Sequence, residues 1–320
     1  MLRDVLLALS ESSLARRIAT DAPFARSVVR RFVAGESEED AIAAARALNG
    51  DGMHVSLDYL GEAVANQQEA LAAEAAIERV VRAVARDDLD ANVSVKLTQL
   101  GQDIDDAFLR RTVASLLDAA EECDLFVRFD MESSEYTQRT LDFFEELWQA
   151  GRRNIGVVLQ SYLYRTEQDV ARVNELGARV RLCKGAYKEP ERVAYPDKAD
   201  VDANFVRCMK TLLTEGNYPG IATHDEAMID ATKRFARERR IDLDSFEFQM
   251  LYGVRRDIQK RLVEEGYHLR IYVPYGEAWY PYFMRRMAER PANLFFVVDS
   301  VVRESPLGFL RPDGRGSSRR

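Results

Sequence analysis

Cysteine and histidine are scarce in this sequence, and their scarcity argues against the common metal sites. The three histidines, His54, His224 and His268, show neither HxH nor HExxH spacing. Zinc and non-haem iron are held by clusters of such ligands, so no metal site is predicted, although a carboxylate-held magnesium ion stays open. The cysteines form no CxxC pair and no secretory leader is recognisable, which predicts reduced thiols in the cytoplasm. They are Cys123, Cys183 and Cys208.

Three further features are missing, and each removes a class of protein. Lysine and arginine total 45 against 53 aspartates and glutamates, a net charge of −8, so nucleic acid is not a predicted partner. No apolar run approaches the ~20 residues of a membrane-spanning helix. Neither GxGxxG nor GxxxxGK[ST] occurs, so the glycine motifs of Rossmann and P-loop proteins are absent.

The sequence does contain a regular alternation of strand-like and helix-like segments. The expected strands are 54–57, 92–97, 125–130, 155–159, 178–183, 220–223, 246–251 and 269–273. The expected helices between them are 66–85, 106–122, 137–150, 167–176, 201–216, 226–239 and 254–266, and a last helix follows from near Pro281. This order predicts an α/β protein built from eight strand–helix units.

Eight such units in about 240 residues favour a (βα)8 TIM-like barrel, which typically takes about 250 residues. A doubly wound open sheet is the alternative, but it usually has fewer strands and a glycine-rich first turn. We expect the barrel to span residues 51–300. Helices at 2–9, 23–34 and 37–48 precede it in an N-terminal segment, 1–50, and Ser37 to Asp40 has the composition of a helix start. A C-terminal extension, 301–320, ends in a basic, glycine- and serine-rich tail that is predicted to be disordered.

Nearly every expected strand ends in a polar or ionisable residue. In a (βα)8 enzyme the chemistry lies at the carboxyl ends of the strands, so these residues are candidates for an active site. Taken singly, Lys96 is a Schiff-base lysine, a charge for an anionic substrate, or a rim lysine. Asp130 pairs structurally with an arginine or acts in catalysis, and His224 is a hydrogen-bonded supporting residue or a catalyst. The full set is Asp58, Lys96, Asp130, Gln160, Arg181 with Lys184, His224, Gln249 and Tyr272.

Two segments are more specific. Alternation along Arg181-Leu-Cys-Lys-Gly-Ala-Tyr187 places Arg181 and Cys183 on one strand face, and the glycine after Lys184 permits a phosphate or a flat ring to approach the backbone. After Pro281, helical spacing puts Tyr282, Arg285, Arg286 and Glu289 on one face, where a solvated helix face is the alternative. Two guanidinium groups side by side grip a carboxylate well, which indicates a small anionic ligand.

Eight motifs, in order and covering residues 50–300, resemble those of proline dehydrogenase. They are Val95-Lys-Leu97, Phe129-Asp-Met-Glu132, Val158-Leu-Gln-Ser-Tyr162, Arg181-Leu-Cys-Lys-Gly-Ala-Tyr187, Ala222-Thr-His-Asp225, Phe246-Glu-Phe-Gln-Met-Leu251, Arg270-Ile-Tyr-Val-Pro274 and Tyr282-Phe-Met-Arg-Arg286. The length resembles the stand-alone bacterial form. The resemblance implies a distorted barrel whose last helix lies over the mouth, and oxidation of L-proline to Δ1-pyrroline-5-carboxylate by hydride transfer to N5 of FAD.

The resemblance also implies roles for individual residues. Asp130, Arg181 and Tyr272 would be catalytic. Residues that bind the substrate would be Lys96, Tyr282, Arg285, Arg286 and Glu289. Contacts to FAD would come from Met131, Gln160, Arg181, Lys184, Gly185, Ala186, Thr223, His224, Gln249, Arg286 and Glu289. One departure from the family pattern is Asp225, where many relatives carry asparagine, and its expected effect is on how tightly FAD is held.

The resemblance implies partners as well. Electrons would pass to a membrane quinone, so a cytoplasmic protein that binds peripherally to the membrane face is expected, and pyrroline-5-carboxylate dehydrogenase would take the product. Two other functions stay open from the residues alone. One is a Schiff-base aldolase on the same barrel with Lys96 or Lys184 as the nucleophile. The other is a module that binds an amino acid without turnover.

Overall fold

A computed structural model describes residues 30–61, 64–280 and 282 of the chain. Residues Phe32–Trp279 form one compact unit, which contains every helix and strand named below. The strands are β1 (His54–Tyr59), β2 (Ala91–Val95), β3 (Val127–Phe129), β4 (Ile155–Gln160), β5 (Arg179–Cys183), β6 (Gly220–Ala222), β7 (Glu247–Leu251) and β8 (Leu269–Tyr275). The helices are α4 (Glu38–Gly50), α5 (Gln67–Arg86), α6 (Asp106–Glu122), α7 (Ser134–Gln149), α8 (Thr166–Leu176), α9 (Lys198–Glu215), α10 (Glu226–Arg239) and α11 (Arg256–Glu264), with short 3-10 turns at Thr98–Leu100 and Leu243–Ser245.

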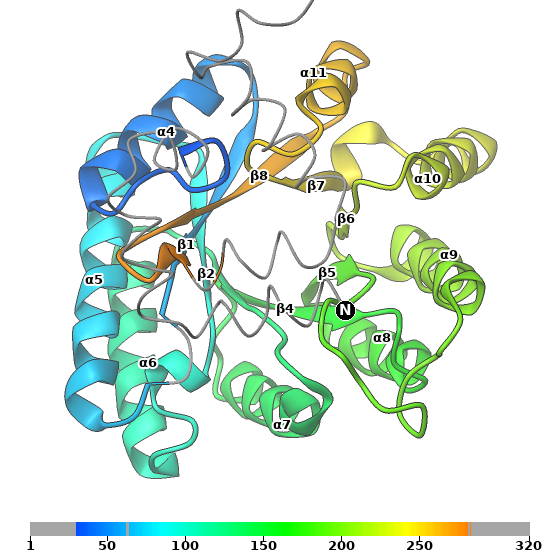
Figure 1. Ribbon diagram of the computed structural model, residues 1–320. Coiled ribbons are helices and arrows are strands. Elements are labelled where there is room, and N and C mark those ends of the chain that lie inside the picture. The colour runs from blue at the N-terminus through cyan, green and yellow to red at the C-terminus, as the bar shows by residue number, and fades with distance from the viewer. Residues whose placement is uncertain (1–29, 62–63, 281, 283–320) are drawn as a thin grey trace, which may run out of the picture. The chain divides into compact units, whose positions relative to one another are not determined.

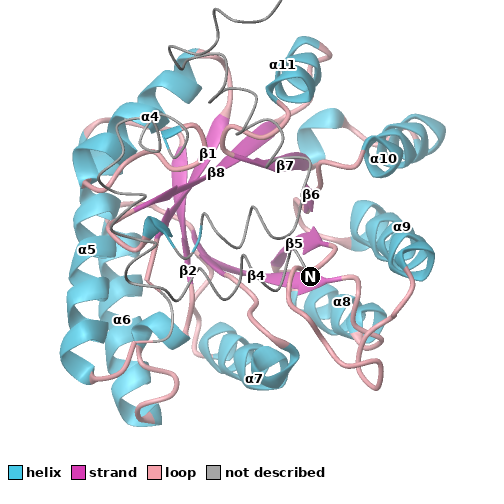
Figure 2. Ribbon diagram, in the orientation of Figure 1, coloured by secondary structure: helices cyan, strands magenta, loops and turns pink. Residues whose placement is uncertain are grey.

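The strands form a closed parallel barrel in chain order, and β8 pairs with β1 to complete the ring. Helices α5 to α11 alternate with the strands and surround them (Figure 1). The same ring of strands inside a ring of helices is seen when the elements are coloured by type (Figure 2). The predicted (βα)8 barrel is confirmed, and the strands and interstrand helices begin and end close to their expected bounds.

Helix α4 begins at the expected signal and covers the seam where the barrel closes. The Ser37 hydroxyl accepts from the Asp40 N–H, and the Asp40 carboxylate accepts from the Ser37 N–H, which is a capping box. The helix packs against β1, β8 and α5. In a regular (βα)8 barrel the helix that follows β8 packs at this position, so here a helix from before β1 occupies it.

The two faces of each strand differ in character. On β1, Val55 and Leu57 face the helices and belong to the main apolar core, while Ser56 and Asp58 are buried on the other face. The same alternation recurs on β2 and β7. The hydrophobic core therefore lies in the layer between strands and helices, and polar side chains fill the barrel interior.

A few expected elements differ from the structure or lie outside the described residues. Helix was expected through Ala34, but Arg31–Ala34 form a turn and a loop. The expected helix at 2–9, most of the one at 23–34, most of the last barrel helix and the C-terminal tail lie outside the described residues. In the described part of the chain, no helix is both long and apolar enough to cross a membrane.

Candidate active site

Arg181 lies at the centre of a hydrogen-bond network inside the barrel. Its Nη1 donates to Asp130 Oδ1 at 2.7 Å, and its Nε donates to Gln249 Oε1 at 2.5 Å. Its Nη2 donates to the hydroxyls of Ser94 and Ser56 at 3.0 and 3.2 Å. These partners stand on β1, β2, β7 and the end of β3, and only a side chain in the interior reaches all of them from β5. The guanidinium group is therefore fixed in position and orientation.

Asp130 joins Arg181 to two more of the predicted residues. The hydroxyl of Tyr272 donates to Asp130 Oδ2 at 2.6 Å, and Lys96 Nζ lies 3.7 Å from the same oxygen. Lys96 also forms an ion pair with Asp58 at 3.0 Å, and its side chain is only 12% exposed, so it is not a rim lysine. Burial and the charges of Asp130 and Asp58 raise the pKa of Tyr272 well above its ordinary value, so this phenol keeps its proton at neutral pH.

The prediction missed two members of this network. Ser56 and Ser94 hold Arg181 and lie 3.0 Å apart from oxygen to oxygen, whereas Asp58, which pairs with Lys96, was among the expected strand-end residues. A signal for them exists in the sequence, where Val55-Ser-Leu-Asp58 and Val93-Ser-Val-Lys96 alternate apolar and polar residues. Alternation places the serines on the same face as Asp58 and Lys96, but serine at such a position carries no chemistry of its own that would draw attention.

The residues expected to contact FAD include one with an unsatisfied polar atom. Gln160 is 4% exposed, and its Nε2 donates to the Met131 carbonyl at 3.4 Å. Its Oε1 is buried and has no hydrogen-bond partner among the residues that the structure describes. Buried polar atoms are rarely left without a partner. A ligand that offers an N–H donor, as a flavin ring does, fits the position.

Gly185 has a different reason for being glycine than the one inferred from the sequence. Its φ of +106° lies in the left-handed region. A Cβ atom here would come within 2.5 Å of the Tyr162 ring. The missing side chain therefore makes room for Tyr162, and not for a ligand approaching from that side. The backbone of this turn stays close to the strand end, and the neighbouring Ala186 is exposed.

Lys184 lies in a group of charges on the loops outside the barrel interior. Its Nζ pairs with Asp202 of α9 and, at 2.7 Å, with Asp225. Lys198 pairs with the same two carboxylates. Burial alone would raise the pKa of Asp225, but hydrogen bonding to Lys184 and its charge lower it to about 2. The departure at Asp225 thus adds a second anion beside a lysine that was expected to contact the cofactor.

The remaining described candidates pack around the strand ends. The Thr223 N–H donates to the Gln249 carbonyl at 3.1 Å, which joins the β6 end to β7. His224 Nε2 accepts from the Leu251 N–H at 2.9 Å. Structural roles for both are therefore visible, and their contact with FAD stays a prediction.

Four predicted residues of the last barrel helix are not placed at this site. Tyr282 is described but does not belong to the compact unit of residues 32–279. Arg285, Arg286 and Glu289 lie outside the described residues. The substrate clamp that they would form remains a prediction from the sequence.

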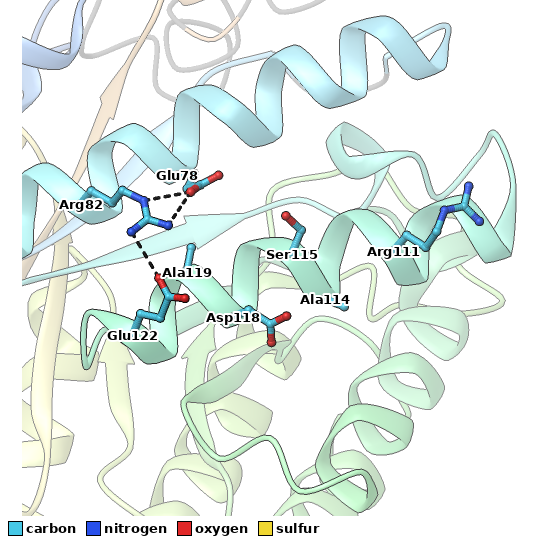
Figure 3. A pocket seen from close by; sticks show the side chains of 8 residues that line it. All are labelled: Glu78, Arg82, Arg111, Ala114, Ser115, Asp118, Ala119 and Glu122. Atoms are coloured by element: carbon cyan, nitrogen blue, oxygen red, sulfur yellow. Dashed lines mark hydrogen bonds and ion pairs between the residues drawn. The ribbon is translucent and has the colours of Figure 1, made fainter.

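We also looked for a metal site and for a surface groove among the described residues. Across residues 30–61, 64–280 and 282, no group of three His, Cys, Asp or Glu side chains could hold a metal ion. A groove on the outer surface between α5 and α6 is lined by charged residues, among them Glu78, Arg82 and Glu122, and Arg82 pairs with both glutamates (Figure 3). The groove is open and polar and does not touch the barrel interior.

The surroundings of the two candidate lysines do not favour a Schiff-base aldolase. Both candidate lysines are held by carboxylates, Lys96 by Asp58 and Lys184 by Asp202 and Asp225. A nucleophilic lysine is activated by desolvation or by a neighbouring cation. Neighbouring carboxylates do the opposite, so these ion pairs do not favour the aldolase.

Comparison with known proteins agrees with the motifs. The family model for proline dehydrogenase matches residues 41–299. Proline dehydrogenase 1 of Bacillus subtilis subsp. natto is 40% identical over 95% of this chain and 100% of its own length, and the proline dehydrogenase of Deinococcus radiodurans is 44% identical over 87% and 91%. The solved structure of proline utilization A from Bdellovibrio bacteriovorus inactivated by N-propargylglycine is similar with a TM-score of 0.80 and 27% identity, over 97% of this chain and 38% of that one. The chain therefore belongs to the proline dehydrogenase family and is an oxidoreductase that acts on proline.

Proposed function

We propose that this protein binds FAD at the carboxyl end of the barrel and oxidises L-proline to Δ1-pyrroline-5-carboxylate. The observation that carries the proposal is the single network that joins Lys96, Asp130, Arg181, Gln249 and Tyr272 from five different strands. Fixed charges of this kind stabilise a transition state without having to reorganise. FAD, when bound, accepts the hydride from proline at its N5 atom.

The described residues that would hold the cofactor supply complementary groups. Gln160 offers a buried acceptor that has no hydrogen-bond partner in the described part of the chain, and Arg181 offers a cation fixed by four hydrogen bonds. A cation against the flavin favours the anionic reduced ring. Met131, Gln249, Thr223 and His224, together with Lys184, Gly185 and Ala186, would supply the remaining contacts to the cofactor.

The chain's own residues would orient proline. Lys96 places a positive charge beside the substrate carboxylate, and Tyr272 lines the proline ring. Asp130 holds both of them and Arg181, so it fixes the spacing between the substrate and cofactor positions. Tyr282, Arg285, Arg286 and Glu289 complete the clamp from the last barrel helix. Proximity and alignment of this kind supply much of the rate enhancement in hydride transfer.

The proposal extends to the steps that follow hydride transfer. Electrons pass to a membrane quinone, which requires peripheral contact between a cytoplasmic protein and the membrane. Pyrroline-5-carboxylate dehydrogenase consumes the product.

An absorption spectrum tests the proposal. The purified protein, supplied with FAD, should be yellow, and its flavin band should bleach when L-proline is added without oxygen. A soluble quinone should then restore the band. A preparation that does not take up FAD contradicts the cofactor assignment, whereas a yellow protein that proline leaves unchanged contradicts the reaction.

A further inference from the structure

The barrel interior contains a buried carboxylate below the active-site network. Glu247 begins β7 and is 2% exposed. It accepts from Gln249 Nε2 at 2.5 Å and from Arg270 Nε at 2.8 Å. Burial alone would raise the pKa of Glu247. The positive charge of Arg270 and the hydrogen bonds that Arg270 and Gln249 donate instead hold this pKa below its ordinary value. Glu247 is therefore a carboxylate, and its oxygens only accept hydrogen bonds.

This carboxylate determines which way the Gln249 amide points. A glutamine amide has a donor end and an acceptor end of nearly the same shape, so the amide alone does not select an orientation. Because Glu247 only accepts, the NH2 group of Gln249 must face it. The Oε1 atom is then left for the Nε–H of Arg181, which donates to it at 2.5 Å. The orientation of Arg181 thus depends on Glu247, although the two do not bond directly.

A glycine on the neighbouring strand makes room for this arrangement. A Cβ atom at Gly220 would lie 2.3 Å from Gln249 Nε2 and 2.7 Å from its Cδ. The φ of Gly220 is not in the left-handed region, so the backbone would accept alanine. The glycine is needed for the space that the Gln249 amide occupies.

We propose that Glu247 is a positioning residue for proline oxidation, and that it acts through Gln249 on the guanidinium group of Arg181. The inference rests on the proposed FAD site, because the effect is on a cation placed against the flavin. Gly220 supports the same arrangement by leaving the space that the amide needs.

The flavin midpoint potential separates positioning from a simple charge effect. Loss of a negative charge in Glu247→Gln would by itself raise the potential, because the reduced flavin is anionic. Displacement of the Arg181 cation would lower it. Gly220→Ala disturbs Gln249 without changing any charge, so it tests the positioning effect alone and serves as the deciding variant if Glu247→Gln does not fold.

The experiment compares four FAD-loaded proteins: wild type, Glu247→Gln, Gly220→Ala and the double variant. We expect a lower flavin potential in Gly220→Ala, an about tenfold lower kcat in each single variant, a KM for proline within about twofold, and little further loss in the double variant. A raised or unchanged potential in Gly220→Ala, or losses that add in full, would overturn the proposal.

Glu74→Gln is the matched control. Glu74 is also a buried carboxylate, 8% exposed, but it lies on α5 and accepts from the Ser115 hydroxyl outside the barrel interior. Its potential and kcat should match those of wild type. The wild-type protein separates this inference from the proposed function: if it binds FAD and is bleached by proline while the variants behave like the control, only the role of Glu247 is wrong.

Discussion

The outward and inward faces of the barrel strands have different roles in this protein, and three consecutive residues of β7 show the difference. Phe248 faces outward and packs its ring edge-to-face against Phe246 and Tyr267, with centroids 5.7 and 5.2 Å away. Glu247 and Gln249, its neighbours in sequence, face inward and belong to the charged network. A TIM barrel usually fills its interior with branched apolar side chains. Here the apolar layer outside the strands provides the stability, and the interior is given to polar groups.

Burial of polar groups inside the barrel has an energetic cost, which the hydrogen bonds and ion pairs of the network offset. Buried polar groups destabilise a fold unless they are paired and hydrogen-bonded. Arg181 uses all three of its nitrogen positions, and Asp130 uses both of its oxygens. The same pairing that makes the interior tolerable also fixes the charges in place. Substitutions can therefore disrupt the two faces separately.

Phe248→Ala breaks the outer face. Phe248 is fully buried, and removal of a buried phenylalanine ring typically destabilises a protein by about 3–5 kcal/mol. We expect a loss of this size in the free energy of unfolding, measured with urea, and an unchanged flavin spectrum in the folded protein. A loss below about 1 kcal/mol would mean that this face does not carry the stability assigned to it.

Arg181→Met breaks the inner face at its centre. The side chain keeps much of its length and loses its charge and its hydrogen bonds to Asp130, Ser56, Ser94 and Gln249. Loss of a preorganised electrostatic group typically lowers kcat by about 100-fold or more, and we expect at least that. Steady-state kinetics with L-proline measure it, together with a lower flavin potential. An unchanged kcat in a folded, FAD-loaded protein would remove Arg181 from the mechanism.

Tyr272→Phe tests the edge of the network. The ring that lines the proline position remains, but the hydroxyl that donates to Asp130 at 2.6 Å is lost. An about tenfold lower kcat is expected, which corresponds to one charge-assisted hydrogen bond of about 1.4 kcal/mol. Tyr136→Phe is the control, because Tyr136 also donates to an aspartate, Asp103, but at the surface. Equal effects in the two variants would mean that the loss is not specific to the site.

Asp225→Asn gives the smallest effect, on the loops outside the interior. Asparagine keeps the oxygen that accepts from the Ala227 N–H at the start of α10 and loses the charge that pairs with Lys184. The folded pKa of Asp225, about 2, is below its ordinary value of about 3.9, so the stabilisation is present above pH 4 and is lost as the pH falls toward 2.

At pH 7 the variant should therefore be less stable than wild type by up to about 1 kcal/mol, because the ion pair is partly exposed. The difference should shrink as the pH falls from 4 to 2. Urea midpoints of both proteins at pH 7 and pH 3 measure it. A difference that does not change with pH would show that the charge of Asp225 contributes nothing.

The fold could be predicted from the sequence because the two patterns that indicate it, strand periodicity and helix-start residues, are local in the sequence. Apolar residues such as Val55 and Leu57 repeat with the strand period, and Ser37 with Asp40 marks a helix start. The barrel and its candidate residues Lys96, Asp130, Arg181 and Tyr272 followed from these signals and from the family motifs.

Which side chains pair with one another inside the barrel could not be predicted in the same way. Which inward side chains meet depends on how the strands are staggered when the barrel closes, and a single strand does not encode this. For Ser56, Ser94 and Glu247, alternation gives the strand face, but their partners Arg181 and Gln249 follow only from the closed barrel. Lys184 was considered as a contact to the cofactor or as a Schiff-base nucleophile, and the structure adds that two carboxylates, from α9 and from the residue before α10, hold it. The clamp of Arg285 and Arg286 still rests on the motif alone.

We claim that the outward strand faces provide stability and the inward faces provide activity. The most direct test is the rate at which L-proline bleaches the flavin without oxygen, measured by rapid mixing at a temperature where every protein is folded. Wild type, Phe248→Ala and Arg181→Met are compared. We expect a rate within about threefold of wild type for Phe248→Ala and a rate at least about 100-fold lower for Arg181→Met. Similar losses in both variants would contradict it, because the outer and inner faces would then not be separable.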